Sequence, residues 1–370
     1  MRVALVHDWL TGMRGGERVL ESLCLLFPQA DIFTLIHVRG SVSPTIESRR
    51  ITTSFVQRLP GASTGYRRYL PLFPAAIEQV DLDGYDLVVS SSHCVAKSAV
   101  VPGRAWHICY CHSPMRYAWD QFDQYFGPER VNPLASRWLY RPLLARLARW
   151  DADTAGRVHR YVANSLYVAG RIRRYYDREA AVVHPPIDTD FFRPSGAPPD
   201  DHLLVVSALV PYKCVERAIE ACAATGTPLR IVGDGPERAR LQHLAGPSVT
   251  FLGHRSDLEV RDEYQRARAV ILAGEEDFGM VPVEAQACGR PVVALARGGA
   301  LETVGDGDTG LLFHEPTAAS LAAAIGRLGT TDFEPAHIRA HAESFSRQHH
   351  LDGIRAVVDD TLSKAPGTRW

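Results

Sequence analysis

The sequence has no excess of charge of either sign. Its 370 residues include 41 Lys and Arg against 42 Asp and Glu, a formal net charge of −1. A chain with so balanced a net charge generates no overall electrostatic field that would attract nucleic acid or an anionic membrane, although local charged patches can still do so. With 46% apolar and 22% charged residues it also falls outside the disordered and fibrous classes. Its length suits two domains.

Two further absences concern the cellular compartment in which the protein is expected. The seven cysteines show neither Cys-x-x-Cys spacing nor a pairing framework, which predicts reduced thiols in a cytoplasmic protein. The N-terminal residues turn polar at His7 and Asp8, too early for a signal peptide. No apolar run approaches the roughly 20 residues that cross a bilayer. Any membrane contact is therefore expected to be peripheral, on the inner face of the plasma membrane.

Short apolar runs recur along the chain, and loops with glycine or polar residues follow them, as in parallel α/β sheets. Residues 3–6 form the first run, and Gly15 and Gly16 lie in the stretch that follows it. The paired glycines either point backbone N–H groups at an anion or supply a loop with positive φ, and the residues alone favour neither. His112 directly follows the run 106–111 and so stands at the carboxyl end of a strand. Parallel sheets bind ligands there, although a single histidine is more often structural.

Residues 134–150 predict an amphipathic helix. A basic helix with tryptophans can rest on a membrane surface, which would suit a lipid-linked acceptor. A helix that faces the core and leaves its basic side in water is the more general expectation. The apolar stripe consists of Leu139, Leu143, Leu147 and Trp150, and the arginines off this stripe are Arg137, Arg141 and Arg149.

A proline-rich stretch divides the chain, as linkers do. We expect an N-terminal domain over residues 1–183, a linker over 184–200, a second domain over 201–345 and a C-terminal helix over 346–370. Because the strand and loop pattern restarts at residue 203, the chain is predicted to hold two consecutive α/β units.

Lys213 follows the first strand of the second half and precedes a helix. A cation there opposes the helix dipole by a few tenths of a kcal/mol to about 1 kcal/mol, and a bound phosphate would remove that penalty. The alternative is a lysine that turns into water. Gly233 and Gly253 follow the next two strands. Since parallel strands end at one edge of a sheet, these loops predict a crevice.

Two glutamates lie around the start of the next helix. Glu276 is expected in the loop and Glu284 one turn into the helix, with Pro282 at the first helical position and Gly289 just past the end. A glutamate in the first turn often completes a capping box, but Val281 at the cap position has no acceptor to reciprocate. Glu284 is therefore a candidate ligand of sugar hydroxyls. The N–H groups that would bind phosphate oxygens belong to Phe278, Gly279 and Met280.

Together these residues resemble family 4 glycosyltransferases of the GT-B fold, over nearly the whole chain. The opening Val-His-Asp-Trp and the segment Val-Pro-Tyr-Lys are similar to bacterial mannosyltransferases that build O-antigen and exopolysaccharide. The motifs that carry the family resemblance are Gly15-Gly16, His112, Pro-Pro-Ile-Asp-Thr-Asp-Phe-Phe at 185–192, Lys213, Gly233-Asp-Gly235, Phe251-Leu-Gly253, and Glu276 with Glu284.

The resemblance implies an α/β fold with two Rossmann-like domains, whose parallel sheets face a central cleft. The C-terminal helix would cross back to the N-terminal, acceptor-binding domain. It also implies transfer of a hexose with retention of configuration, without divalent metal or cofactor. The donor would be a nucleotide sugar, most often GDP-mannose in the mannosyltransferase branch. The acceptor would be a glycan or a lipid-linked saccharide, with membrane contact through 134–150, and no nucleic acid would be bound.

The roles implied by the resemblance fall into two groups. The catalytic pair is His112 and Glu276, which would contact the transferred sugar. Lys213 would bind the donor diphosphate and Glu284 the ribose hydroxyls. The remaining donor-binding residues are Gly15, Gly16, Gly233, Gly253, Phe278, Gly279 and Met280.

One departure from the family concerns the donor phosphates. Relatives carry Gly-Arg where this chain has Ser207-Ala208, and that arginine also binds diphosphate. A charge-assisted bond of about 1.5 to 3 kcal/mol is missing unless Arg14, Arg255 or Arg297 replaces it.

Other functions stay open on the residues. They are a transferase of the same fold that uses a UDP-sugar, an epimerase or phosphorylase on the same paired domains, and a catalytically weak sugar-nucleotide-binding scaffold. A dehydrogenase is disfavoured because the dinucleotide fingerprint is incomplete.

Overall fold

The computed structural model describes residues 1–128 and 131–365, which divide into two compact units. The first comprises Met1–Pro186 together with the chain from Gln348 onward, and the second comprises Ile187–Arg347. Residues 187–200, expected to be linker, belong to the second unit. Of the C-terminal segment expected over 346–370, residues 366–370 lie outside the described residues.

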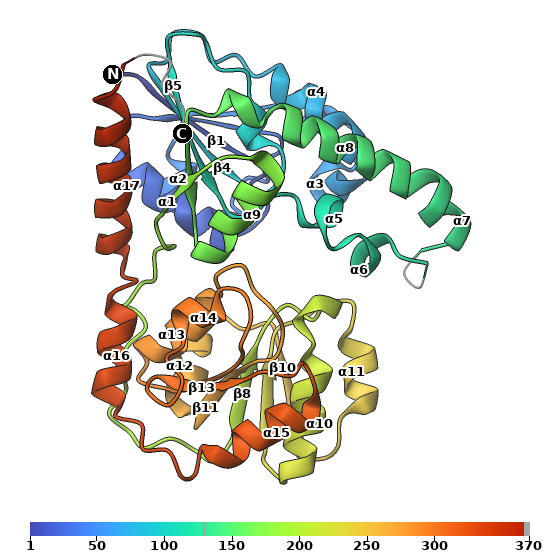
Figure 1. Ribbon diagram of the computed structural model, residues 1–370, viewed down its shortest axis with the longest axis vertical. Helices are drawn as coiled ribbons and strands as arrows, with labels where there is room; N and C mark the ends of the chain where they lie inside the picture. The colour runs from blue at the N-terminus through green and yellow to red at the C-terminus, as the bar shows by residue number, and fades with distance from the viewer. Residues whose placement is uncertain (129–130, 366–370) are drawn as a thin grey trace. The chain divides into compact units, whose positions relative to one another are not determined.

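A parallel sheet of seven strands runs through the first unit in the order β3-β2-β1-β4-β5-β6-β7. Figure 1 labels β1, β4 and β5 of this sheet. Along β1, Val3 and Leu5 enter one core, and Ala4 and Val6 enter the core on the opposite face. Covering both faces requires apolar residues at every position, which explains the continuous apolar runs of the sequence. The strands are β1 (Val3–His7), β2 (Asp31–Thr34), β3 (Ile51–Thr53), β4 (Leu87–Ser92), β5 (Trp106–Cys111), β6 (Arg160–Ala163) and β7 (Ala180–Val182).

The first unit also contains the last helix of the chain, α17 (Arg347–Leu362), red in Figure 1. Its Ile354 and Val358 are buried in the same core as Leu5. At Gly353 a Cβ atom would lie 2.9 Å from Val183, so glycine allows the helix to approach closely. The other helices are α1 (Gly15–Leu26), α2 (Pro44–Glu47), α3 (Ala62–Gly65), α4 (Phe73–Glu78), α5 (Arg116–Trp119), α6 (Phe122–Phe126), α7 (Pro133–Ala135), α8 (Arg141–Asp153) and α9 (Leu166–Tyr176).

Helix α8 differs from the helix expected over 134–150. It begins at Arg141, after one π-helical turn (Ser136–Tyr140), and it buries Leu144 and Leu147. A π-helical turn holds more residues than an α-helical turn, so it rotates the preceding side chains away from the helix face. Leu139 is consequently exposed. The expected stripe is wrong at its N-terminal end.

The second unit contains a parallel sheet of six strands in the order β10-β9-β8-β11-β12-β13. Its first strand repeats the pattern of β1, since Leu203 and Val205 enter one core and Leu204 the other. Two parallel sheets covered by helices confirm the predicted fold class. The strands are β8 (Leu203–Val206), β9 (Leu229–Val232), β10 (Val249–Gly253), β11 (Ala269–Leu272), β12 (Val292–Leu295) and β13 (Gly310–Phe313), and the helices are α10 (Val215–Thr225), α11 (Arg238–Leu244), α12 (Asp257–Arg266), α13 (Met280–Ala287), α14 (Ala300–Thr303), α15 (Ala318–Arg327) and α16 (Pro335–Glu343).

The chain enters and leaves the second unit at neighbouring points. The Ile187 N–H donates to the carbonyl of Phe345 at 3.0 Å, and the Arg347 N–H donates to the carbonyl of Ile187 at 3.1 Å. The guanidinium of Arg347 also pairs with Asp188 at 2.7 Å. The two ends of this unit are therefore joined to each other.

Candidate active site

In both sheets the strand order reverses beside the first strand of the unit. β2 and β4 flank β1 in the first sheet, and β9 and β11 flank β8 in the second. Parallel α/β sheets bind their ligands at the carboxyl ends of the strands at such a reversal. Gly15 and Gly16 follow β1, whereas Lys213 follows β8 and Glu276 follows β11. The sequence therefore places site candidates at the reversal point of each sheet.

Lys213 and Glu276 are in direct contact. Lys213 ends a short 3-10 turn (Pro211–Lys213), and its ammonium nitrogen Nζ meets the carboxylate oxygen Oε1 of Glu276. Both side chains are largely shielded from solvent. Although the two residues are 63 positions apart, the structure brings them into one cluster.

A glycine pair holds the next loop against this cluster. The Gly299 N–H donates to the carbonyl of Glu276 at 2.8 Å. A Cβ atom on Gly298 would lie 2.2 Å from that carbonyl oxygen, and one on Gly299 would lie 2.3 Å from Cα of Phe278. No other residue type allows the loop after β12 to lie so close. Its backbone therefore fixes the position of Glu276.

Gly233, directly after β9, and Gly253, the last residue of β10, join the two strand ends. The Gly233 N–H donates to the carbonyl of Gly253 at 2.8 Å. Gly233 has a φ of 127°, and a Cβ atom there would lie 1.9 Å from the carbonyl oxygen of Ser207. Backbone packing alone thus explains Gly233. The donor-binding roles of both glycines stay predictions.

Helix α13 starts earlier than the sequence predicts. It begins at Met280, with Gly279 as the capping residue at a φ of 84°, and Pro282 is its third residue. The expected start at Pro282 is wrong because a glycine with left-handed backbone ends the loop two residues sooner. Gly289 takes the left-handed conformation expected past the end of the helix, with a φ of 74°.

Glu284 is held by a buried tyrosine. The hydroxyl of Tyr264 on α12 donates to Oε2 of Glu284 at 2.9 Å. Tyr264 is fully buried, and no spacing in the sequence pointed to it. Phe278 is buried against Phe345, with ring centroids 5.7 Å apart. Phe278 therefore fills the core, and only its backbone is suited to bind a ligand.

In the first unit, Gly15 and Gly16 are the first two residues of α1, and neither has a positive φ. A loop that requires glycine for its backbone angles is therefore ruled out. A Cβ atom on Gly16 would lie 3.5 Å from Cε1 of His7 and 3.7 Å from Nε2 of His112. The N-terminus of α1 thus lies against His112, as a shared site requires.

His112 is half-buried after β5. Its Nε2 lies 2.8 Å from Oγ of Ser91, and its carbonyl accepts from Nδ2 of Asn164 at 3.0 Å. Burial lowers the pKa of His112 well below its usual value, and the neighbouring His93 lowers it further. The imidazole is therefore neutral near pH 7, and it can bind a sugar through hydrogen bonds without charge.

Sequence reasoning missed a carboxylate–histidine pair next to His112. Asp8 is fully buried, and its two oxygens accept four backbone N–H groups of residues 93–96 at 2.7 to 2.9 Å. Nδ1 of His93 lies 3.1 Å from Oδ2 of Asp8, and the His93 side chain is 33% exposed. Both residues directly follow a strand, β1 and β4. His112 was singled out because it directly follows a strand, and the same criterion identifies Asp8 and His93.

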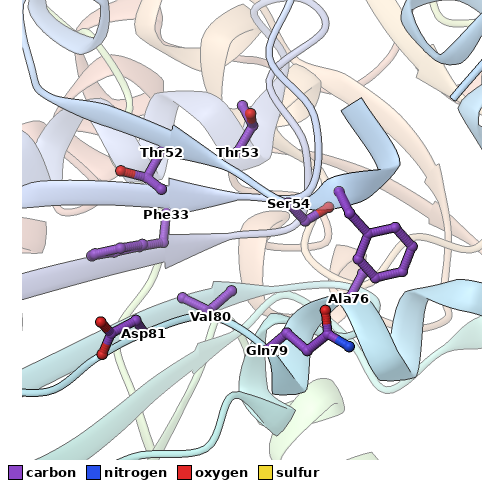
Figure 2. Close-up of a pocket in the computed structure, with 9 residues that line it drawn as sticks. Phe33, Thr52, Thr53, Ser54, Ala76, Gln79, Val80 and Asp81 are labelled. Carbon is purple, nitrogen blue, oxygen red and sulfur yellow. The ribbon is translucent and has the colours of Figure 1, made fainter. Parts of the chain in front are cut away.

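A hollow of about 220 Å³ lies elsewhere in the first unit. Figure 2 shows Phe33 of β2, Thr52 and Thr53 of β3, and Gln79 after α4 around it. It contains none of the predicted site residues, and it is smaller than the roughly 300–1,000 Å³ of most ligand pockets. The strand exits therefore remain the better candidate for a nucleotide-sugar site.

Two family models match the chain. "Glycosyltransferase Family 4" matches residues 13–191, and "Glycosyl transferases group 1" matches residues 187–344. The two matches correspond closely to the two structural units.

One curated relative is the D-inositol 3-phosphate glycosyltransferase of Acidothermus cellulolyticus. It is 31% identical over 250 residues, which are 58% of this chain and 56% of that protein. The chain thus spans little more than half the length of this relative.

Solved structures show the same fold at low sequence identity. Anabaena HepE in complex with UDP is 19% identical, with a TM-score of 0.73 over 97% of this chain and 100% of that one. WaaG, a glycosyltransferase involved in lipopolysaccharide biosynthesis, is 18% identical, with a TM-score of 0.64 over 98% and 100%.

Proposed function

Because the chain belongs to the glycosyltransferases of family 4 with the GT-B fold, we propose that it transfers a hexose from a nucleotide sugar to a saccharide acceptor. The acceptor is a glycan or a lipid-linked saccharide of the cell envelope or of an exopolysaccharide. This assignment follows from the resemblance to bacterial mannosyltransferases.

The observation that carries the proposal is the contact between Lys213 and Glu276 at the reversal point of the second sheet. Departure of a nucleoside diphosphate develops negative charge, which a lysine and the N-terminus of α13 stabilise. A carboxylate next to that lysine accepts hydrogen bonds from the hydroxyls of the transferred sugar. Glu284, one turn into α13, is assigned to the ribose.

We propose GDP-mannose as the donor, on the resemblance of the opening residues and of the Lys213 segment to mannosyltransferases. A UDP-sugar is the second candidate, because the structural neighbour HepE was solved with UDP. The proposal includes retention of configuration and independence of divalent metal, as the family resemblance implies.

The test measures binding and turnover across GDP-mannose and a panel of UDP-sugars, with and without EDTA. A ligand that binds only the native protein raises its melting temperature, so thermal shifts rank the donors before an acceptor is known. We expect the largest shift and the fastest turnover with GDP-mannose, unchanged by EDTA. Preference for a UDP-sugar would refute the mannose donor, and loss of activity in EDTA would refute metal independence. Tight binding without turnover on any lipid extract would favour a sugar-nucleotide-binding scaffold.

Arg297 is our candidate for the arginine that Ala208 replaces. It lies two residues after the end of β12, it is exposed, and it makes no ion pair with any residue that the structure describes. The next residue, Gly298, pairs with Glu276 through a parallel bridge. We expect Arg297→Ala to weaken donor binding about tenfold or more, the effect of losing one charge-assisted bond. Titration calorimetry with the preferred donor measures this loss.

Arg255→Ala is the matched control. Arg255 already pairs with Glu259 one turn along the chain, at 3.4 Å, so its charge is engaged. Its replacement should leave the donor Kd within about twofold. Equal losses in the two variants would contradict the assignment to Arg297.

The proposed membrane contact is the segment 134–150, and in particular its N-terminal part, 134–139. Its Leu134, Trp138 and Leu139 are 69%, 70% and 56% exposed, and the guanidinium of Arg137 lies 5.1 Å from the Trp138 ring. Exposed apolar side chains beside arginines suit an anionic lipid surface, where each basic residue contributes about 1 kcal/mol. Within the described residues, every helix is too short or too polar to span a bilayer. We propose a peripheral contact, as the sequence led us to expect.

We expect the double variant Trp138→Ala/Leu139→Ala to bind phosphatidylglycerol vesicles about tenfold more weakly than the native protein, in a co-sedimentation assay. Its control, Leu258→Ala/Leu301→Ala, removes two similarly exposed leucines of the second unit. Native protein that stays in the supernatant, or a control that weakens binding equally, would contradict the contact.

A further inference from the structure

A buried series of polar contacts leads from α1 to His112. Nδ1 of His7 lies 3.1 Å from Oγ of Ser91, and the same oxygen lies 2.8 Å from Nε2 of His112. On its other side, Nε2 of His7 faces Oε1 of Glu17 at 3.8 Å. His7, Ser91 and Glu17 are almost fully buried, so water does not compete for these contacts.

Three adjacent strands and one helix position the residues of this series. His7 ends β1 and stands directly beside Ser91 of β4 in the parallel register. His112 directly follows β5, the neighbour of β4, and Glu17 lies in the first turn of α1. The register of the sheet therefore sets the spacing of the histidines on either side of one serine.

The direction of the hydrogen bonds follows from the single proton of Ser91. A hydroxyl between two imidazole nitrogens donates to one and accepts from the other. If Ser91 donates to His7, then His7 carries its proton on Nε2, toward Glu17, and His112 carries its proton on Nε2. In the opposite direction, Nε2 of His7 would carry no proton and would still face the Glu17 carboxylate. An ionised Glu17 disfavours that arrangement.

Glu17 is ionised for three reasons. Its Oε2 accepts from the N–H of Arg14 at 3.1 Å. It lies in the first turn of α1, where the helix dipole favours negative charge. Burial would raise its pKa, but the contacts with His7, with His93 and with the backbone together lower the pKa below the usual value.

We propose that Glu17, His7 and Ser91 are positioning residues that hold His112 in the tautomer with its proton on Nε2. Nδ1 of His112 then keeps its lone pair and makes no hydrogen bond within the part of the chain that the structure describes. It is the atom that accepts a hydrogen bond from a sugar hydroxyl. This consequence rests on the sugar-binding role proposed for His112, whereas the tautomer itself does not.

The direct test is the side-chain ¹⁵N spectrum of the histidines in the full-length protein, with His112 assigned by substitution. We expect a proton on Nε2 of His112 that exchanges slowly with water and a non-protonated Nδ1. Ser91→Ala should abolish the slow exchange. Glu17→Gln removes the charge that fixes the direction, and it should shift His112 toward the tautomer with its proton on Nδ1.

Ser90→Ala is a matched control from the adjacent position of the same strand. Oγ of Ser90 lies 2.9 Å from Nε2 of His107, so this variant also removes a buried serine–histidine contact, but outside the series. It should leave the His112 signals unchanged. A native His112 with its proton on Nδ1, or signals unchanged in both Ser91→Ala and Glu17→Gln, would overturn the proposal.

Turnover of the preferred nucleotide sugar gives a second readout. We expect Ser91→Ala and Glu17→Gln to lower kcat about 10- to 100-fold, the range that follows loss of a group that orients a histidine in metal sites. Donor Kd should stay within about twofold, because the residues assigned to the diphosphate lie in the second unit. Native kcat in both variants would overturn the functional part of the proposal. If the native protein turned over no nucleotide sugar, the proposed function would fail, and the tautomer would still be decided by the spectra.

Discussion

Replacing Lys213 with alanine should lower the rate of glycosyl transfer by about 100- to 1,000-fold. Losses of this size follow removal of one group that stabilises developing negative charge in a transition state. Lys213 is the cation in direct contact with Glu276, and it stands where β8 and β11 end next to each other. The effect should appear mainly in kcat, with a smaller rise in donor Kd, because the charge on the leaving diphosphate grows as the sugar departs. Steady-state kinetics and titration calorimetry with the preferred donor separate the two.

Two variants separate chemistry from structure at this position. Glu276→Gln keeps Lys213 but removes its partner, so a loss of stability shared with Lys213→Ala would reveal a merely structural contact. Arg240→Ala removes a positive charge of the same unit that pairs with Glu216 and Glu237, and it should leave kcat unchanged. If Lys213→Ala kept more than about a third of native kcat, Lys213 would not be a ligand of the diphosphate.

Replacing Lys97 with alanine should destabilise the first unit by about 3 to 5 kcal/mol, the cost of breaking a buried ion pair from one side. The ammonium of Lys97 lies 3.0 Å from Oδ1 of Asp151, and both side chains are almost completely buried. Oδ2 of Asp151 also accepts from Nε1 of Trp119 and from the hydroxyl of Tyr176, each at 2.8 Å. Without the lysine, a buried carboxylate would keep its neutral donors but lose its counter-charge. Urea denaturation followed by tryptophan fluorescence measures the loss.

The control for this prediction is Arg355→Ala on α17. Arg355 pairs with Asp352 at 2.9 Å, but both side chains are more than half exposed. Exposed pairs contribute about 0 to 1 kcal/mol. A loss below about 1 kcal/mol in Lys97→Ala would show that Trp119 and Tyr176 suffice to keep the Asp151 carboxylate stable.

Much of the fold could be predicted because parallel strands covered on both faces consist of continuous apolar runs, which are easy to recognise in the sequence. The run 106–111 became β5 with the expected bounds, and the pattern that restarts at residue 203 became β8. Element boundaries that depend on one backbone conformation were harder. The left-handed Gly279 moved the start of α13, and a π-helical turn exposed Leu139.

The candidate site was predictable only where a residue follows a strand and also belongs to a recognisable motif. Lys213 and Glu276 met both conditions, and the structure joined them. Ser91, inside β4, gains its contacts from the lateral register of three strands, which one sequence does not specify. Tyr264 contacts Glu284 from another helix, and the spacing of residues within one helix does not predict such a contact.

The joined ends of the second unit have a consequence for how such proteins diversify. Ile187 and Arg347 are linked by a backbone hydrogen bond, so 187–347 is a contiguous piece of chain whose termini already meet. Closing a segment of this kind costs little additional chain entropy in a new host. A double crossover, with one exchange at each end of this segment, could therefore replace the unit to which we assign the donor, while both parts of the first unit and its histidines are inherited intact. Donor and acceptor specificity can then evolve as separate traits.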